Sequence, residues 1–356
     1  MTDHQWMIYG AYGYSAQLII ELAVNKGLRP IVAGRNQEKT QAIAEKFNLE
    51  SRAFDLTNHT VIKENLTGVS TVIHCAGPFS ATSAPMIEGC LLAKTNYFDI
   101  TGEISVFEHA HSKEINDRAI AADITICPGI GFDVIPTDCI AKTLSEAMPD
   151  ATHLEMAFAS KASLSPGTAK TSIEGLAKGT LERINGRIQS VKAKVKTVPM
   201  STGPQKVLQM SWGDVSTAYY TTGIPNIALY IGLPEKQINA AGKAAWFRWL
   251  FKMTFVQNYL KKKVEASVKG PDKTARDASS THLWGKASNA KGQTIEAHLT
   301  TANGYTLTQI APVMIIEHLC GASLAKGSQT PALLFGKNFV STLDGCSEIT
   351  LTSKDT

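Results

Sequence analysis

The sequence lacks several features that would assign a function at once. Its six cysteines are scattered with no C-x-x-C pair, so we interpret them as reduced core residues of a cytosolic protein. The nine histidines show no ligand spacing with a cysteine or a carboxylate, so no metal site is expected. A net charge of +4 is too small to favour nucleic acid as a partner.

Long apolar runs are also missing. The sequence has no run of about 20 apolar residues and no charged-then-apolar leader, so we expect neither a membrane span nor export, and we expect a cytoplasmic location. The 356 residues, 44% hydrophobic and 19% charged, are typical of a globular protein with two domains. We place the domains at 1–130 and 131–330, with a possible return of 331–356 to the first domain.

One short stretch near the beginning combines a buried strand, a tight turn and a helix that starts near Gly13. Its small residues have the spacing G-x-x-G-x-x-A. Gly10 lets the chain turn off the strand, Gly13 lets the backbone approach a pyrophosphate, and Ala16 lets the helix pack on the sheet. The helix N-terminus offers N–H groups to the phosphates. The predicted phosphate-binding turn comprises Gly10, Ala11, Tyr12, Gly13, Tyr14 and Ser15.

Apolar runs and helical patterns alternate through the first 130 residues. The expected strands cover 6–9, 30–33, 51–54, 70–75, 97–100 and 123–127. The expected helices cover 13–25, 37–47, 59–66, 83–93 and 105–122. This alternation predicts an α/β fold with a Rossmann-type, doubly wound parallel sheet.

The pattern changes after Pro128. A helix is expected over 132–148, followed by strand-like alternation mixed with two further helices near 168–179 and 312–318. The strand-like runs are 153–159, 187–196, 219–220, 227–231, 294–301 and 305–309. This part therefore predicts a second, α+β domain with a mostly antiparallel sheet, which we interpret as a substrate or dimerisation domain.

The end of the second predicted strand indicates which nicotinamide cofactor binds. NAD-selective folds place a carboxylate there, whereas this chain has Arg35 and Asn36. A guanidinium pairs with a 2′-phosphate that a carboxylate would repel, so the residues favour NADP. A solvated arginine after a strand is the alternative. Asp55, at the end of the third strand, is a candidate partner for the adenine amino group, and a turn or cap role is its alternative.

Several turns at the expected strand ends form a recognisable set. They are Gly10–Ala16, Ala33–Arg35, Cys75–Phe79, Tyr97–Glu103 and Pro128–Asp138, joined in the second part by Ser165–Ala169, Leu283–Lys286 and Gln329–Ala332. Together they resemble the saccharopine dehydrogenase-like oxidoreductases, the group that includes trans-acting enoyl reductases. The resemblance implies an NADP-binding Rossmann domain and a second α+β domain. Enzymes that make or cleave saccharopine carry a tighter G-x-G-x-x-G turn, so the "-like" branch fits better.

The carboxyl ends of parallel strands are where ligands bind in such a fold. The cofactor contacts expected there are Ala76, Gly77, Pro78 and Phe79. Reduction of an imine or an enoyl-type double bond also needs a proton source. The candidates are Glu103, Asp133 and Asp99. Glu103 and Asp133 have an alternative role as caps of the helices that follow them.

Two alternatives concern the whole protein. The first is a scaffold or redox sensor that binds NADP without turnover. The second concerns Lys243–Lys263, where aromatic side chains are interspersed with positive charges. This segment is either a membrane-surface helix or a helix buried against the second sheet or a dimer partner. We expect a small-molecule or lipid-like substrate and a homodimer.

Overall fold

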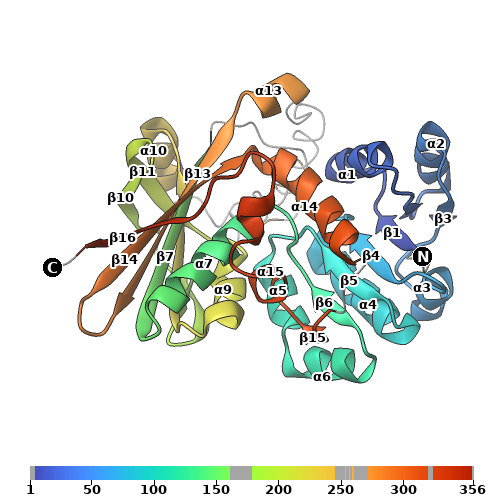
Figure 1. Ribbon diagram of the computed structural model, residues 1–356, viewed down its shortest axis with the longest axis horizontal. Coiled ribbons are helices and arrows are strands. Elements are labelled where there is room, and N and C mark those ends of the chain that lie inside the picture. The colour runs from blue at the N-terminus through green and yellow to red at the C-terminus, as the bar shows by residue number, and fades with distance from the viewer. Residues whose placement is uncertain are drawn as a thin grey trace. The chain divides into compact units, whose positions relative to one another are not determined.

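The computed structural model describes residues 5–160, 179–244, 253, 256, 259, 272–319 and 324–354. The chain forms two compact units (Figure 1). The first combines residues 1–135 with 305–336, and the second combines 136–304 with 337–356. The domain boundaries expected at residues 130 and 330 stay a prediction.

A seven-stranded, fully parallel sheet forms the centre of the first unit in the described residues. Its strand order is β15-β6-β5-β4-β1-β2-β3. The strands are β1 (Trp6–Tyr9), β2 (Ile31–Gly34), β3 (Ser51–Ala53), β4 (Thr71–His74), β5 (Asn96–Asp99), β6 (Thr125–Cys127) and β15 (Gly327–Ser328). This arrangement confirms the doubly wound sheet, and β15 adds an edge strand that the sequence pattern did not predict. The strand order reverses between β1 and β4, the point at which such folds bind ligands.

Helices flank this sheet (Figure 1). They are α1 (Tyr14–Asn25), α2 (Gln37–Phe47), α3 (His59–Asn65), α4 (Phe79–Ala93), α5 (Ile104–Ala110), α6 (Lys113–Ala121), α14 (Gly304–Leu319) and α15 (Pro331–Phe335). Every residue of β1 and β4 is buried, as expected for strands covered on both faces, although β4 also contains the polar residues Thr71 and His74. The single helix expected over 105–122 is wrong: α5 ends before His111, and the Ser112 hydroxyl begins α6 by accepting from the Ile115 N–H.

The helix α14 returns from far along the chain to pack on α1. Gln309 Nε2 donates to the Leu18 carbonyl at 3.0 Å, and Lys26 pairs with Glu317 at 2.8 Å. The strand expected over 305–309 is therefore wrong. Leu307 and Ala311, four residues apart, are both buried, which is the helical period that a five-residue window conceals.

A nine-stranded sheet organises the second unit in the described residues, in the order β10-β11-β12-β7-β13-β14-β16, with β8 and β9 attached beside β12. β7 pairs in parallel with β12, whereas its pairing with β13 and the pairs flanking these strands are antiparallel. The mostly antiparallel second sheet is thus confirmed. The strands are β7 (Ala151–Ser160), β8 (Thr180–Ile184), β9 (Arg187–Val191), β10 (Val195–Met200), β11 (Gly203–Met210), β12 (Asn226–Gly232), β13 (Ser280–Asn289), β14 (Thr294–Ala302) and β16 (Thr350–Lys354).

The helical segments of the second unit are α7 (Ile135–Ala147), α9 (Asp214–Thr222), α10 (Glu235–Ala244), α13 (Lys273–Asp277) and a 3-10 turn (Phe339–Thr342). The strand expected at 219–220 is wrong, because these residues lie in the last turn of α9. The run 187–196 contains two strands rather than one. At the C-terminal end, β16 pairs with β14 in this second sheet, whereas α15 belongs to the first unit.

Two segments named in the sequence analysis fall outside this description. The helix near 168–179, with the Ser165–Ala169 turn, lies outside the described residues, and so does nearly all of the basic aromatic segment 243–263. Within the described ranges, no helix has the length and apolar character needed to cross a membrane.

Candidate functional site

The β1–α1 turn has the backbone shape that its glycines predict. Gly10 adopts φ +88°, and its N–H donates to the Ala33 carbonyl at 2.8 Å. A Cβ on Gly10 would lie 2.7–2.9 Å from backbone and side-chain atoms of Ala76. The absence of a side chain at Gly10 therefore lets the turn after β1 lie directly against the loop after β4.

The N-terminus of α1 fits a pyrophosphate. Gly13 is its N-cap residue, and a Cβ there would meet the Gly10 carbonyl oxygen at 3.2 Å. Among the described residues, no side chain caps this helix end, and its first turn holds no acidic residue. The backbone N–H groups and the positive end of the helix dipole are thus oriented for a bound anion. The binding of the cofactor phosphates by the turn Gly10–Ser15 stays a prediction.

At the end of β2 lies the residue predicted to choose between NAD and NADP. Arg35 is exposed, and within the part of the chain that the structure describes no hydrogen bond or ion pair engages its guanidinium. Asn36 begins α2, with its side-chain oxygen accepting from the Lys39 N–H at 2.9 Å. Lys39 Nζ lies 5.8 Å from the Tyr12 ring centroid. Lys39 thus adds a second cation near this strand end, one that the sequence analysis missed.

Asp55 follows β3 and is largely used in a turn. One of its carboxylate oxygens accepts from the N–H of Thr57 at 2.9 Å and from the Thr57 hydroxyl at 2.5 Å. These bonds lower the pKa of Asp55. The geometry has the features of the turn alternative, and the adenine contact stays a prediction.

Glu103 caps a helix, although not the one that follows it. Its two carboxylate oxygens accept from the N–H groups of Phe79 and Ser80, at 2.8 and 2.9 Å. These groups belong to the first turn of α4. In the described structure the Glu103 side chain makes no cap bond to α5, so the expected cap of the following helix is wrong. Both carboxylate oxygens are thus used to hold the loop Ala76–Phe79 from its far end.

Asp99 is a buried structural acceptor. It is fully buried, and its carboxylate accepts from the Tyr97 hydroxyl at 2.6 Å, the Thr101 N–H at 3.0 Å and the Gly129 N–H at 2.8 Å. Burial raises its pKa to about 6 against the opposing effect of these bonds. The residue connects the end of β5 to the loop after β6, and three donors surround it.

Asp133 lies in the same loop and differs from the other two carboxylates. It is partly exposed, and desolvation by the surrounding protein raises its pKa to about 7. Its carboxylate lies over Gly102, where a Cβ would come within 2.7 Å of Asp133 Oδ2. The neighbouring Phe132 N–H donates to the Thr308 hydroxyl of α14 at 3.0 Å. Sequence reasoning missed this contribution from α14, because no local pattern links residues so far apart.

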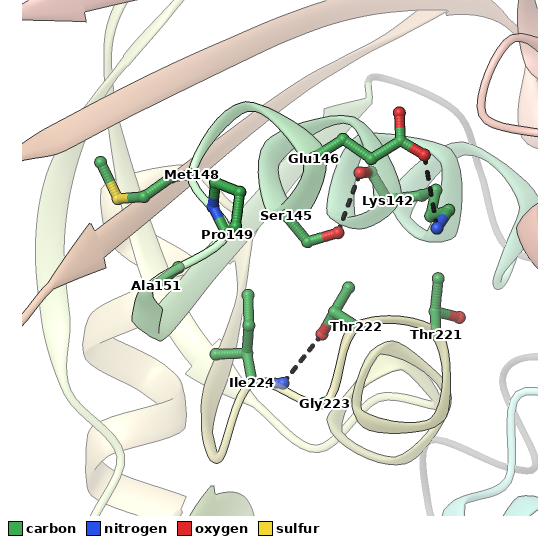
Figure 2. A pocket seen from close by; sticks show the side chains of 10 residues that line it. All are labelled: Lys142, Ser145, Glu146, Met148, Pro149, Ala151, Thr221, Thr222, Gly223 and Ile224. Carbon is green, nitrogen blue, oxygen red and sulfur yellow. Dashed lines mark hydrogen bonds and ion pairs between the residues drawn. The ribbon is translucent and has the colours of Figure 1, made fainter.

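A separate pocket lies wholly within the second unit, between the last turns of α7 and α9 (Figure 2). Its volume is about 490 Å³. Ser145 donates to the Lys142 carbonyl, Thr222 donates to the Ala218 carbonyl, and Lys142 pairs with Glu146 at 3.3 Å. Because its polar groups bond to the protein itself, the pocket offers no clear catalytic group. None of the predicted site residues lines it.

The described residues contain no group of three or more His, Cys, Asp or Glu side chains that could hold a metal ion.

Comparison with known proteins gives consistent results. Residues 6–127 match the family model described as the saccharopine dehydrogenase NADP binding domain. A saccharopine dehydrogenase-like oxidoreductase of Bos taurus is 27% identical over 151 residues, covering 37% of this chain and 35% of that protein. A trans-acting enoyl reductase of Mycobacterium ulcerans is 25% identical over 143 residues, covering 38% and 34%. The matched segments thus span about a third of the length of each of these relatives.

A solved structure shares the fold over nearly the whole chain. Apo saccharopine dehydrogenase (L-Glu forming) from Saccharomyces cerevisiae superposes with a TM-score of 0.63 at 12% identity, covering 99% of this chain and 100% of that one. At this identity the likeness concerns the fold alone. The glycine turn, the helix end that fits a phosphate and the family match lead to one conclusion. Residues 6–127 form a domain similar to the saccharopine dehydrogenase NADP binding domain.

Proposed function

We propose that this protein is an NADPH-dependent oxidoreductase that reduces an imine or an enoyl-type double bond in a small-molecule or lipid-like substrate. One observation carries the proposal. Asp133, a partly exposed carboxyl group with a pKa raised to about 7, follows a strand of the same parallel sheet whose β1–α1 turn fits the cofactor phosphates. A cofactor turn and a proton donor at strand ends of one sheet are the two parts that such a reduction needs.

The cofactor is held by residues of the first unit. The N-terminus of α1, with Gly10 and Gly13, receives the pyrophosphate, and Arg35 pairs with the 2′-phosphate. The loop Ala76–Phe79 borders the part of the dinucleotide beyond the pyrophosphate. Bound NADPH supplies the hydride.

The proton comes from the protein. After hydride addition to one end of the double bond, the other end, a nitrogen in an imine or a carbon in an enoyl group, takes up a proton. A donor works best when its pKa lies near the working pH. Asp133 meets this condition and is partly exposed. Glu103 and Asp99 are weaker candidates, because the first caps α4 and the second is fully buried among three donors.

The names of two relatives guide the choice of test substrates. One curated relative is named a saccharopine dehydrogenase-like oxidoreductase and another a trans-acting enoyl reductase. A direct test adds NADPH and a panel of imines, enones and unsaturated acyl esters, and follows the loss of NADPH absorbance. We expect turnover with one of these classes, abolished by Gly13→Asp, which places a negative charge where the phosphates bind. Tight NADPH binding with no turnover on any member of the panel would overturn the proposal in favour of a scaffold or redox sensor.

The homodimer and a peripheral membrane contact through residues 243–263 remain proposals of their own. Membrane contact predicts co-sedimentation with anionic liposomes that weakens as salt is added, because surface charge attraction is screened. The absence of co-sedimentation at low salt would rule it out. Sedimentation equilibrium tests the dimer.

A further inference from the structure

A fully buried histidine ends β4, just before the loop Ala76–Phe79. His74 is 0% exposed. Its ring centroid lies 5.5 Å from that of Tyr9, 5.4 Å from the edge-on ring of Phe79 and 6.2 Å from that of Tyr97. Burial lowers the pKa of His74 to about 3, so the imidazole stays neutral across the physiological range. Neither the phosphate site nor the proton donor uses it.

The imidazole makes one hydrogen bond that defines its protonation. His74 Nε2 lies 3.0 Å from the Thr82 hydroxyl, which donates to the Ala76 carbonyl at 2.6 Å and lies 3.1 Å from the Pro78 carbonyl. Because the hydroxyl proton points to these carbonyls, the Thr82 oxygen accepts from His74 Nε2–H. This assignment leaves Nδ1 as a bare acceptor, and Nδ1 has no hydrogen-bond partner among the described residues.

Packing alone does not explain a histidine here. A buried polar atom without a partner destabilises the folded state. A phenylalanine would fill the same aromatic surroundings without that cost. The bond to Thr82 is what distinguishes the histidine, and Thr82 in turn holds the carbonyl of Ala76.

Ala76 is also the residue that contacts the phosphate-binding turn. A Cβ on Gly10 would lie within 2.9 Å of Ala76 atoms, so any shift of this loop changes the space beside the turn. From the other side, Glu103 holds the N–H groups of Phe79 and Ser80. The loop is thus held at two places. Thr82 bonds to the carbonyls of Ala76 and Pro78, and Glu103 accepts from the N–H groups at the start of α4.

We propose that His74 is a positioning residue for the cofactor: through Thr82 it holds Ala76–Pro78 at the spacing from Gly10 that the nicotinamide half of NADP(H) requires. The inference rests on the NADP site and is independent of the proposed hydride transfer. The strand order separates the two halves of the ligand, since β4 and β2 lie on opposite sides of β1. Their ends are therefore about 10 Å apart, two strand spacings. A ligand confined to the adenosine end, beside Arg35, does not reach Ala76.

Isothermal titration calorimetry with two ligands tests this role. NADPH spans both halves of the site, whereas adenosine 2′-monophosphate, which has no 5′-phosphate, occupies only the adenosine end beside Arg35. We expect Thr82→Val and His74→Phe each to weaken NADPH binding roughly tenfold, the factor that about 1.4 kcal/mol represents. The Kd of adenosine 2′-monophosphate should not change. Thr82→Ser, which keeps the hydroxyl, should bind NADPH as the wild type does. The double variant should bind NADPH no more weakly than either single variant, because each substitution already breaks the same chain of hydrogen bonds from His74 through Thr82 to Ala76.

Other results overturn the inference. Equal weakening of the binding of both ligands indicates general damage to the fold. Unchanged NADPH binding in Thr82→Val shows that the hydrogen bonds of Thr82 do not position the loop Ala76–Pro78. Additive effects in the double variant show that the two residues act separately. If His74→Phe does not fold, the Thr82→Val and Thr82→Ser pair decides the question. Because binding is measured without turnover, failure here is distinct from failure of the proposed reduction.

Discussion

The two sides of the first parallel sheet differ in how their strand ends are built. On the β1–β2 side, the groups expected to bind the cofactor are accessible: Gly13 is partly exposed at the start of α1, and Arg35 is exposed. On the β4–β6 side, side chains are committed to bonds with the protein, as Glu103 is with α4 and Asp99 is with the loop after β6. We expect the first side to recognise a ligand with backbone groups and cationic side chains, whereas the second side holds the loops after β4 and β6 in place and carries Asp133, the proposed proton donor.

The largest expected effect tests Asp133, the proposed proton donor. Asp133→Asn should lower kcat for the accepted substrate by a factor of about 10² to 10⁴, the usual contribution of a general acid. NADPH affinity should be unchanged, because the phosphates and Arg35 are untouched. Stopped-flow measurement of NADPH oxidation gives kcat, and calorimetry gives the Kd. Asp123→Asn, on the exposed turn before β6, is the matched control. Wild-type kcat in Asp133→Asn would remove the residue from the mechanism.

The pH dependence follows from the same group. The donor form of Asp133 is the neutral acid, which is present below a pKa of about 7. We expect kcat to fall tenfold per pH unit above pH 7 and the residual kcat of Asp133→Asn to lack this limb. Stability has the same sign. The folded-state pKa exceeds the unfolded value, so the stabilisation that is full below about pH 4 is lost as the pH rises towards 7. The thermal unfolding temperature of Asp133→Asn should therefore change less with pH across this range than that of the wild type.

The next effect concerns the contact between the two sides. Gly10→Ala introduces a Cβ against Ala76 at a residue with φ +88°. Gly27→Ala is the control, because Gly27 has φ +82° while the described atoms leave open space around it. We expect Gly27→Ala to lower the free energy of unfolding by roughly 1–2 kcal/mol through backbone strain alone. Gly10→Ala should lose about 1–3 kcal/mol more through the clash, together with NADPH affinity. If urea unfolding gives the same loss of unfolding free energy for both variants, Ala76 does not restrict the space at Gly10.

A smaller effect tests how the β1–β2 side recognises the cofactor. Arg35→Ala should weaken NADPH binding about 10- to 100-fold, because a hydrogen bond to a charged group is worth roughly 1.5–3 kcal/mol. NADH binding, which involves no 2′-phosphate, should hardly change. Arg29→Ala is the control, since this exposed arginine donates to the carbonyls of Val24 and Leu28. Equal affinity of the wild type for NADPH and NADH would contradict the assignment.

The smallest effect concerns the β4–β6 side, where Glu103 binds the start of α4. Glu103→Ala removes the carboxylate from the start of α4 and should lower the free energy of unfolding by about 1–2 kcal/mol, as the loss of a helix cap does. Glu114→Ala, on the exposed face of α6, should cost less than 1 kcal/mol. If Glu103→Ala lowers kcat as far as Asp133→Asn does, Glu103 takes part in the reaction and is more than a cap of α4.

Local features were accessible from the sequence alone. The alternation of strands and helices, the Gly10–Ala16 turn and the position of Arg35 at the end of β2 each depend on residues close together in the chain. Sterics at a glycine and the burial of a short strand act over a few residues, which is why pattern and spacing predicted the sheet and the NADP turn.

Only the tertiary structure decided the partners of the β4–β6 side. Glu103 caps α4, 24 residues back, rather than the adjacent α5, and the Asp99 carboxylate binds Gly129, 30 residues on. Thr308 reaches Phe132 across 176 residues. These pairs depend on strand order and helix packing, which bring distant segments together and carry no local sequence period. A hydrogen bond forms where two groups meet in space, and the sequence specifies that meeting only through the whole fold.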